Sequence, residues 1–231
     1  MKVLKLSLLA LGMGLSGLAQ ADVIGVKGDL SYWAYDGQAN MAAQTAASDQ
    51  DLERKGAAQL SLAIEHPVPL IPNAKIRYVN LKTQTENEVA GQPVYDINMD
   101  HADFILYYEI LDNIVNADVG VGATTLNGHV TTLALSKTDI DKTVPVIYAT
   151  AGAKLPFTGL SAKGEVLYSN FNDAKITDAQ AELQYNFIDN LLVDVGLKAG
   201  YRILDIKLDD YEKKDLKFNF KGPYIGLDIH F

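Results

Sequence analysis

Apolar and polar residues alternate with a period of two along much of this 231-residue chain. The clearest stretch runs from Leu191 to Ile203, where Leu, Val, Ala, Tyr and Ile share one face and Asp, Gly, Lys and Arg share the other. The segment from Asp178 to Phe187 repeats this alternation. A period of two is typical of a β-strand with one apolar and one polar face.

Eight shorter segments follow the same rule and bring the number of predicted strands to ten. They are Ile24–Tyr35, Gln59–Glu65, Lys75–Lys82, Ala102–Glu109, Ala117–Thr125, Val146–Leu155, Leu160–Tyr168 and Phe218–Phe231. Several have about the 9 to 11 residues that a tilted transmembrane strand needs, and bacterial barrels have an even number of strands. Eight or twelve strands are the alternatives, because the weak alternation from His129 to Leu135 also suits an extra hairpin within a loop.

The predicted connections alternate between long and compact. The long ones are Asp36–Arg54, Thr83–Asn98 and Leu126–Val144, and the compact ones are His66–Ala74, Leu111–Asn116, Pro156–Gly159 and Ile188–Asn190. Outer-membrane barrels have long outer loops and short periplasmic turns. The sequence therefore predicts an all-β, single antiparallel up-and-down transmembrane barrel, with both ends of the mature chain on the periplasmic side.

The N-terminal segment has the features of a cleaved signal peptide. Lys2 and Lys5 precede an apolar run from Leu6 to Leu18, and Ala19-Gln20-Ala21 matches a signal-peptidase site. We expect residues 1–21 to be removed and residues 22–231 to form one exported barrel domain. Because no later apolar run is long enough for a spanning helix, a membrane span would have to use strands.

The C-terminal residues YIGLDIHF form a final amphipathic strand that ends in an aromatic residue. This ending resembles the sorting signal of outer-membrane barrels, and the residues that carry it are Tyr224, Ile225, Leu227, Ile229 and Phe231. The resemblance implies the bacterial outer membrane as location. The expected partners are outer-membrane lipids, lipopolysaccharide and, during biogenesis, the barrel-assembly machinery.

The stretch MDHADFILYYEILDNIVNADVGVG, from Met99 to Gly122, is similar to the most recognisable segment of a family of small Gram-negative outer-membrane β-barrel proteins of unassigned activity. The opening strand with Trp33, the turn LPFTGL and the terminal Phe also fit that family. The resemblance implies a fold and a location, and it transfers no catalytic residues.

Composition narrows the possible functions. The chain has no cysteine, so disulfides and thiolate metal sites are excluded. The formal charge is −9, and it becomes −11 after loss of Lys2 and Lys5, which argues against a nucleic-acid partner. The four histidines, His66, His101, His129 and His230, have no metal-site spacing. We expect no cofactor and no metal, and we single out His101 with Asp103 as the one pair on the same side of a strand.

If the apolar faces contact lipid, the polar faces fill a narrow lumen with charges of both signs. The predicted lumen charge network is Lys27, Asp29, Glu65, Arg77, Asp103, Glu109, Lys163, Glu165, Glu182, Asp194, Lys198, Arg202 and Asp228. Lys75, Asp118 and Lys154 lie on the same polar faces. Buried charges must pair or keep water, and small barrels are barely wide enough for their own side chains. We therefore favour a plugged, non-enzymatic barrel with a structural or weak small-solute pore role over an open conduit.

Aromatic residues gather near the ends of the predicted strands, where a membrane interface would require them. The predicted girdle contains Tyr32, Trp33, Tyr35, Tyr78, Tyr107, Tyr108, Tyr148, Phe157, Tyr168, Phe171, Tyr185, Phe187, Tyr201 and Tyr224.

Two other functions stay open. An omptin-like hydrolase would use Asp/His pairs at the outer rim, and the candidates are Asp36, Asp49, Asp51, Asp139, Asp141 and His129. Against this hypothesis, the chain is short and its loops lack the extension above the membrane that such a cleft needs. The other alternative is a soluble periplasmic β-barrel that binds an apolar ligand, since it would also alternate along its strands.

Overall fold

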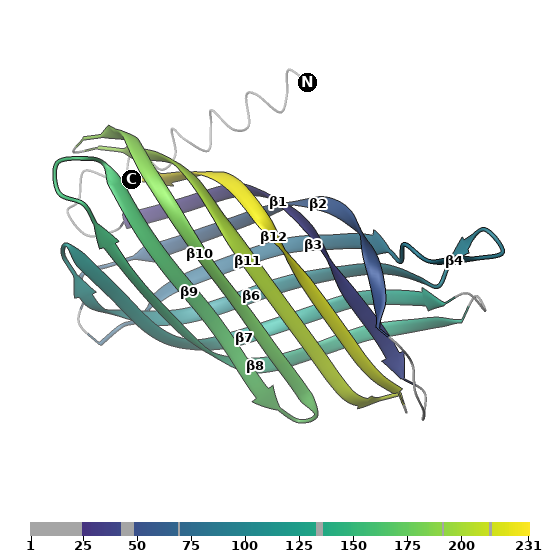
Figure 1. Ribbon diagram of the computed structural model, residues 1–231. Helices are drawn as coiled ribbons and strands as arrows, with labels where there is room; N and C mark the ends of the chain where they lie inside the picture. The colour runs from purple at the N-terminus through teal and green to yellow at the C-terminus, as the bar shows by residue number, and fades with distance from the viewer. Residues whose placement is uncertain (1–24, 43–48, 69, 133–135, 191, 213) are drawn as a thin grey trace, which may run out of the picture.

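The computed structural model describes residues 25–42, 49–68, 70–132, 136–190, 192–212 and 214–231, and the predicted signal peptide lies outside these ranges. Ten long strands form one closed antiparallel barrel, which confirms the predicted fold and strand number (Figure 1). They are β1 (Gly25–Ala42), β2 (Gln50–Glu65), β3 (Asn73–Gln84), β6 (Tyr95–Asp112), β7 (Val115–Thr132), β8 (Lys137–Lys154), β9 (Leu160–Phe171), β10 (Ala174–Asp189), β11 (Asp194–Tyr211) and β12 (Lys214–His230). A small hairpin, β4 (Glu88–Val89) with β5 (Gln92–Pro93), lies in the connection between β3 and β6. Within the described ranges no helix is long and apolar enough to cross a membrane.

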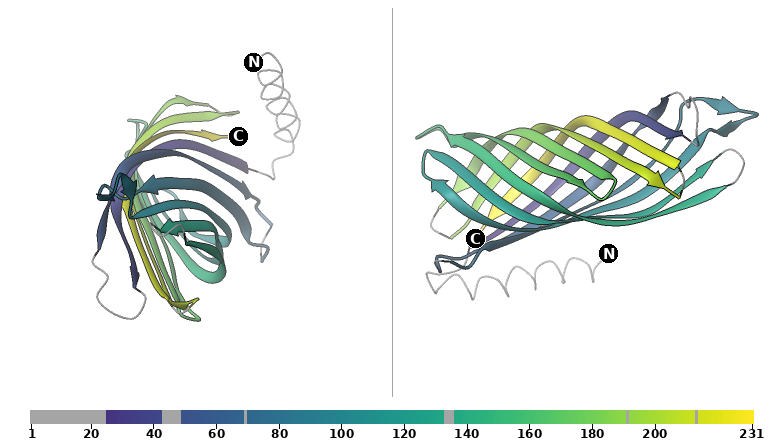
Figure 2. Two further views of the ribbon diagram at one scale, coloured as in Figure 1. Left: turned by 90° about the vertical axis from the view of Figure 1, so that its right-hand side faces the viewer. Right: turned by 90° about the horizontal axis from the view of Figure 1, so that it is seen from below.

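The barrel is closed by the pairing of β1 with β12, so every strand neighbours the next one along the barrel wall. Backbone hydrogen bonds from Val26 N to Phe231 O (3.1 Å) and from Phe231 N to Val26 O (2.9 Å) extend this pairing to the last residue. The strands are inclined to the barrel axis, as Figure 2 shows. Both ends of the barrel domain therefore lie at one end of the barrel, which we call the terminus end; the opposite end is the loop end.

The compact connections lie at the terminus end, as predicted, and join β2 to β3, β6 to β7, β8 to β9 and β10 to β11. The predicted long loops are wrong in extent. Residues 36–42 and 50–54 belong to β1 and β2, residues 95–98 to β6, and most of 126–144 to β7 and β8. The predicted extra hairpin at His129–Leu135 is also wrong for its described part, because His129 to Thr132 simply continue β7. The strands thus continue well beyond the segments in which the apolar face points outward.

The barrel wall has two sections with opposite patterns, and β11 shows both. From Asp194 to Arg202 the inward positions are polar or glycine, while Leu197, Tyr201 and Ile203 point outward and are exposed. From Leu204 to Leu208 the inward positions are apolar and buried, and Asp205 and Lys207 point outward. We call the half with the apolar outer face the belt section and the half towards the loop end the loop section.

The outer face of the belt section is apolar on all sides of the barrel. Its exposed residues include Leu30, Tyr32, Leu60, Leu62, Ile64, Ile76, Tyr78, Phe104, Tyr108, Val119, Val121, Ile147, Val166, Leu183, Tyr185, Leu197, Tyr201, Ile203, Ile225 and Leu227. Such a continuous apolar surface far exceeds the few hundred Å² that soluble monomers expose, and it has the form of the lipid-facing band of a membrane barrel.

The loop section is filled by one hydrophobic core. Its buried residues include Trp33, Tyr35, Leu52, Leu81, Ile97, Met99, Leu126, Val130, Ile140, Val144, Ile176, Leu204, Ile206, Leu216, Phe218 and Phe220. Each large apolar side chain that is fully buried contributes about 1.5–3 kcal/mol. This section is therefore built like a soluble barrel, with an apolar interior and a polar outside.

Candidate functional site: the charged lumen

Two arginines occupy the centre of the lumen, at the boundary between the two sections. Arg77 comes from β3 and Arg202 from β11, with β12, β1 and β2 between them in the barrel wall. Both side chains are buried, with relative exposures of 2% and 0%. Their inward direction follows from the strand period, because each lies on the polar face of its segment.

Carboxylates from three other strands bind these guanidinium groups. Arg77 donates to Asp103 on the adjacent β6 (2.8 Å) and reaches across the lumen to Glu165 on β9 (2.7 Å) and Asp178 on β10 (2.6 Å). Arg202 donates twice to Asp178, at 2.9 and 2.7 Å. A buried charge is tolerated when it is paired and its remaining hydrogen-bonding groups are used. The cross-lumen bonds thus tie opposite walls of the barrel together.

Neutral groups and a third cation complete this central cluster. Arg202 also donates to Gln59 Oε1 and lies 3.2 Å from His101 Nδ1, and Lys75 binds Glu165. Thr124 donates to Asp103 (2.6 Å). Counting formal charges, Arg77, Arg202 and Lys75 balance Asp103, Glu165 and Asp178. The cluster is therefore a buried network inside the barrel in which the formal charges balance.

Aromatic residues cover the central cluster on its loop-section side. The Trp33 ring lies 4.6 Å from the Arg202 guanidinium carbon, within the range of a cation–π contact. Its indole Nε1 donates to the Gly222 carbonyl (3.1 Å), so the one polar atom of the ring is paired. Tyr35 then packs edge-on against Phe220, with ring centroids 5.7 Å apart. The central cluster is therefore in direct contact with the apolar core of the loop section.

On the other side of the cluster, towards the terminus end, lies a cavity of about 80 Å³. Its wall contains further ion pairs: Lys198 binds Asp29 and Glu182, and Lys27 binds Glu65 at 2.7 Å. The Tyr107 and Tyr224 hydroxyls donate to Glu65 and Glu182, each at 2.7 Å. The belt section therefore keeps space beside its charges.

All thirteen residues of the predicted charge network lie on the lumen side of their strands or at the mouth of the lumen. Arg77, Asp103, Glu165 and Arg202 belong to the central cluster, while Lys27, Asp29, Glu65, Lys163, Glu182, Lys198 and Asp228 line the cavity. Glu109 lies 3.9 Å from Lys27, and Asp194 lies 3.9 Å from His230 near the terminus end. Charge does not fill the whole lumen, however, because the loop section is apolar inside.

Three central residues, Asp178, Gln59 and Thr124, are missing from the sequence prediction. Asp178 opens the predicted strand Asp178–Phe187 on its polar face, so its position relative to Glu182 was enough to place it in the lumen. Gln59 lies on the polar face of a short segment and carries no charge, and sequence offers no signal that it accepts a bond from Arg202.

The predicted aromatic girdle is wrong for five of its members. Trp33, Tyr35, Tyr107, Tyr148 and Tyr224 are buried inside the barrel, where their polar atoms bind lumen or backbone groups. Tyr32, Tyr78, Tyr108, Phe157, Phe171, Tyr185, Phe187 and Tyr201 are exposed, as a girdle requires. Aromatic rings at interior positions fill volume that aliphatic side chains would leave empty in a ten-stranded barrel.

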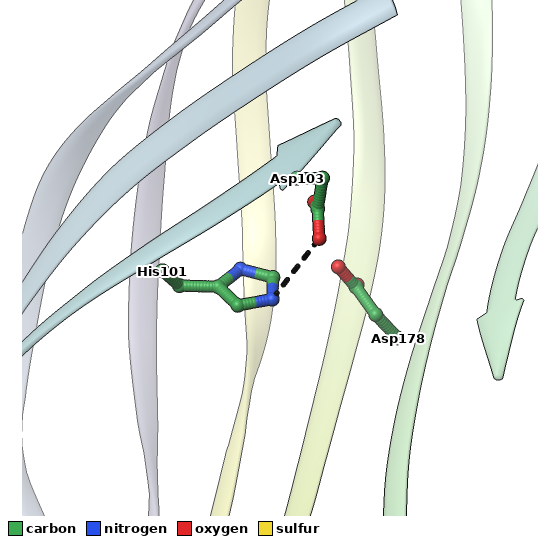
Figure 3. A group of neighbouring side chains, drawn as sticks. All are labelled: His101, Asp103 and Asp178. Carbon is green, nitrogen blue, oxygen red and sulfur yellow. Dashed lines mark ion pairs between the residues drawn. The ribbon is translucent and has the colours of Figure 1, made fainter. Parts of the chain in front are cut away.

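His101, Asp103 and Asp178 bring potential metal-binding atoms within 4.8 Å of one another (Figure 3). His101 and Asp103 share one side of β6, as expected, with Nε2 and Oδ1 3.5 Å apart. However, Asp178 already accepts bonds from both arginines, and Asp103 accepts from Arg77 and Thr124. A cation would meet two guanidinium groups here, so this donor set does not fit a metal ion.

The residues of the rim-hydrolase hypothesis do not form one group. Asp36 lies on β1 and binds Arg54 (2.8 Å), whereas Asp139 and Asp141 lie on β8, on the opposite side of the barrel. Asp139 pairs in register with His129 on the outer surface and binds Lys137. Asp51 is an exposed residue of β2, next to Asp49. Within the described ranges, the candidates are spread around the outer wall.

Comparison with known proteins supports the fold. The chain is similar to the outer membrane protease OmpT from Escherichia coli, with a TM-score of 0.53, 10% identity, and coverage of 90% of this chain and 97% of that one. It is also similar to the outer membrane protein OprG from Pseudomonas aeruginosa, with a TM-score of 0.41, 12% identity and coverage of 90% and 95%. No family model matches the chain, and no curated protein does. The chain has the fold of outer-membrane β-barrel proteins.

Proposed function

We propose that this chain is a non-enzymatic integral protein of a bacterial outer membrane, with a structural role and a lumen that does not conduct. The observation that carries the proposal is the double closure of the lumen. A neutral ionic cluster around Arg77 and Arg202 crosses the barrel, and a hydrophobic core fills the half beyond it.

The apolar outer face of the belt section supports the membrane location. Exposed Leu, Ile, Val, Phe and Tyr side chains surround the barrel at the level where the interior is charged. This is the reverse of a soluble barrel, in which the apolar face points inward, and it argues against the soluble periplasmic alternative. Outer-membrane lipids and lipopolysaccharide are the partners that such a surface would contact. The barrel-assembly machinery would recognise the last strand, whose Ile225, Leu227, Ile229 and Phe231 face outward.

A weak small-solute pore is the second candidate, and the cavity beside Lys198 favours it. For a pore, the solute would have to pass from this cavity between Arg77 and Asp178 and then through the apolar core. Trp33, Met99, Leu204 and Phe220 in that core have exposures of 0%. The path is blocked twice, so we favour the closed barrel.

The distribution of rim residues supports the non-enzymatic part of the proposal. Acyl-transfer or hydrolytic chemistry needs a base and its partners within hydrogen-bond reach of one substrate position. Asp36 lies across the barrel from His129 and Asp139. The similarity to OmpT concerns the fold, and we do not transfer the protease activity in that protein's name.

Extraction and gel mobility test the membrane part of the proposal. The protein is produced with its N-terminal segment, and membranes are washed with carbonate or urea before detergent extraction. We expect the chain to stay with the membranes until detergent is added, and its unboiled form to migrate differently from the boiled form. Release by carbonate, without a change of mobility on boiling, would favour the soluble barrel and contradict the proposal.

A further inference from the structure

Each of the four turns at the terminus end carries an exposed large apolar side chain. Leu70, between β2 and β3, and Phe157, between β8 and β9, are 91% and 107% exposed. Ile114 and Leu192 occupy the other two turns and are also exposed. Turns in water normally carry Gly, Asn, Asp or Ser at such tips.

The backbone at two of these tips has a conformation that Leu and Phe rarely adopt. Leu70 has φ of 70° and Phe157 has φ of 66°, in the left-handed region that glycine and asparagine enter more readily. Local chain geometry therefore does not explain why large apolar residues stand there. Their side chains, rather than their backbone preferences, suit these positions.

In three of the four turns, a polar side chain bonds to backbone groups of the same turn. Asn190 Oδ1 accepts from the backbone N–H groups of Leu192 and Val193, and Asn113 Oδ1 accepts from that of Ile114. Thr158 Oγ1 donates to the Leu155 carbonyl and accepts from Leu160 N. A backbone group without a hydrogen-bond partner is costly in a lipid environment. The side chains of these turns supply such partners to several backbone groups.

In the β2–β3 turn, a side chain on the outer face of the barrel pairs a backbone carbonyl. The Tyr108 hydroxyl, on the outward face of β6, donates to the Leu70 carbonyl at 2.8 Å. Pro67 and Pro72 lack backbone N–H groups altogether. Asp112 and Lys154, beside the β6–β7 and β8–β9 turns, pair in register with Asn116 and Ser161 on the lumen face.

The strands alone are too short for a complete lipid-facing band. Outward apolar positions run from Val195 to Ile203 on β11 and from Val115 to Ala123 on β7. At ~3.3 Å per residue and a tilt of about 35–45°, eight residues cover roughly 19–22 Å along the membrane normal. The usual band is about 25 Å tall. The apolar turn tips extend the band at the terminus end and so add to its height.

From these observations we infer that the four turns of the terminus end are immersed in the lipid leaflet and form the lower edge of the lipid-facing band. This inference rests on the proposed membrane location. The surface that covers Leu70 and Phe157 is phospholipid, because the tips are continuous with the belt section and the Asn113, Thr158 and Asn190 side chains of the turns are already paired. The terminus end of the barrel therefore does not project into water.

Site-directed spin labelling tests the inference directly, because the chain contains no cysteine. Single variants Leu70→Cys and Phe157→Cys are labelled with a nitroxide and folded into dimyristoylphosphatidylcholine vesicles. Leu197→Cys serves as a control in the belt section, and Asp139→Cys as a control on the exposed outer face of the loop section. A shift of gel mobility on boiling verifies the folding of each variant.

We expect labels at 70 and 157 to collide more with oxygen than with a water-soluble nickel complex, as the label at 197 does, while the label at 139 prefers nickel. Nickel-dominated collisions at 70 and 157, with oxygen-dominated collisions at 197, would overturn the inference and leave the membrane location intact. Nickel-dominated collisions at 197 as well would contradict the proposed function and the inference together.

Discussion

Arg77 and Arg202, from strands separated by three others in the barrel wall, donate to the same oxygen atom, Oδ2 of Asp178, at 2.6 and 2.7 Å. Two cations share one carboxylate, and all three side chains are buried. The three-residue link joins β3 to the paired strands β10 and β11 across the lumen, and no strand ladder connects β3 with either of them.

Removing the shared carboxylate should destabilise the barrel. Asp178→Asn keeps the shape of the side chain but leaves two buried guanidinium groups with one negative charge fewer. Loss of one partner from a buried ion pair costs about 3–5 kcal/mol. We expect a clear decrease in the urea midpoint of unfolding of the protein in detergent. Asp139→Asn is the control, because solvent and salt screen its exposed pair with Lys137; an equal decrease in both variants would contradict the role of the cluster.

Neighbouring aromatic residues should differ sharply in their contribution to stability. Trp33→Ala removes the ring between Arg202 and the apolar core, and truncation of a buried Trp costs about 3–5 kcal/mol. Tyr32 is the next residue along β1, but it points outward and is 56% exposed. We expect Trp33→Ala to lower the thermal midpoint much more than Tyr32→Ala. Similar shifts would show that the interior of the loop section is not packed as described.

A charge on the outer face should matter only in the belt section. At the middle of a lipid-facing band, Lys or Arg costs about 2–4 kcal/mol. Leu197→Lys places a cation there, whereas Asn219→Lys places one on the polar outer face of the loop section. We expect a lower yield of heat-modifiable, vesicle-inserted protein for Leu197→Lys alone. Equal yields of the two variants would contradict the position of the band.

Closure of the barrel between β1 and β12 depends on a close approach at Gly222. A Cβ atom at this position would lie 1.9 Å from the Ala34 carbonyl oxygen and 3.0 Å from the Tyr35 Cα. We expect Gly222→Ala to force the two strands apart and to reduce the folded fraction. At Gly28, also in the β1–β12 pair, an added Cβ would meet only the Ile229 carbonyl at 4.0 Å. Gly28→Ala should fold normally, and a folded Gly222→Ala barrel of unchanged stability would be inconsistent with this packing.

The strand number could be predicted because the apolar outer face has a simple period of two. In the belt section of β11, the alternation from Leu191 to Ile203 specifies both the strand and its orientation. The turns were equally clear, since the compact segments near Pro156 and Asn190 contain typical turn residues.

The sequence pattern did not predict the strands of the loop section, and the reason is physical. Between Arg202 and Leu204 the inward positions change from polar to apolar, and between Ile203 and Asp205 the outward positions change in the opposite sense. The alternation itself continues, but an assignment based on an apolar outer face ends at the change. The same inversion on β1 and β2 made Asp36–Arg54 resemble a long polar loop.

The site could be predicted only as a set of inward charges. Period-two patterning places Arg77, Asp103 and Arg202 on the lumen side, but it gives no information on which strands face one another across the barrel. The cross-lumen bonds from Arg77 to Glu165 and Asp178 depend on barrel closure and strand stagger. The contact of Trp33 with Arg202 has the same origin.

Ion conductance of the expected mature chain, residues 22–231, in a planar lipid bilayer tests the closed lumen most directly. The protein is refolded in detergent, and its insertion is verified by gel mobility in vesicles of the same lipid. We expect no discrete conductance steps, because the central cluster and the apolar core both close the barrel. Stable steps from the unmodified protein, with an ion selectivity that changes in Lys198→Gln, would show that current passes through the lumen and would contradict the account.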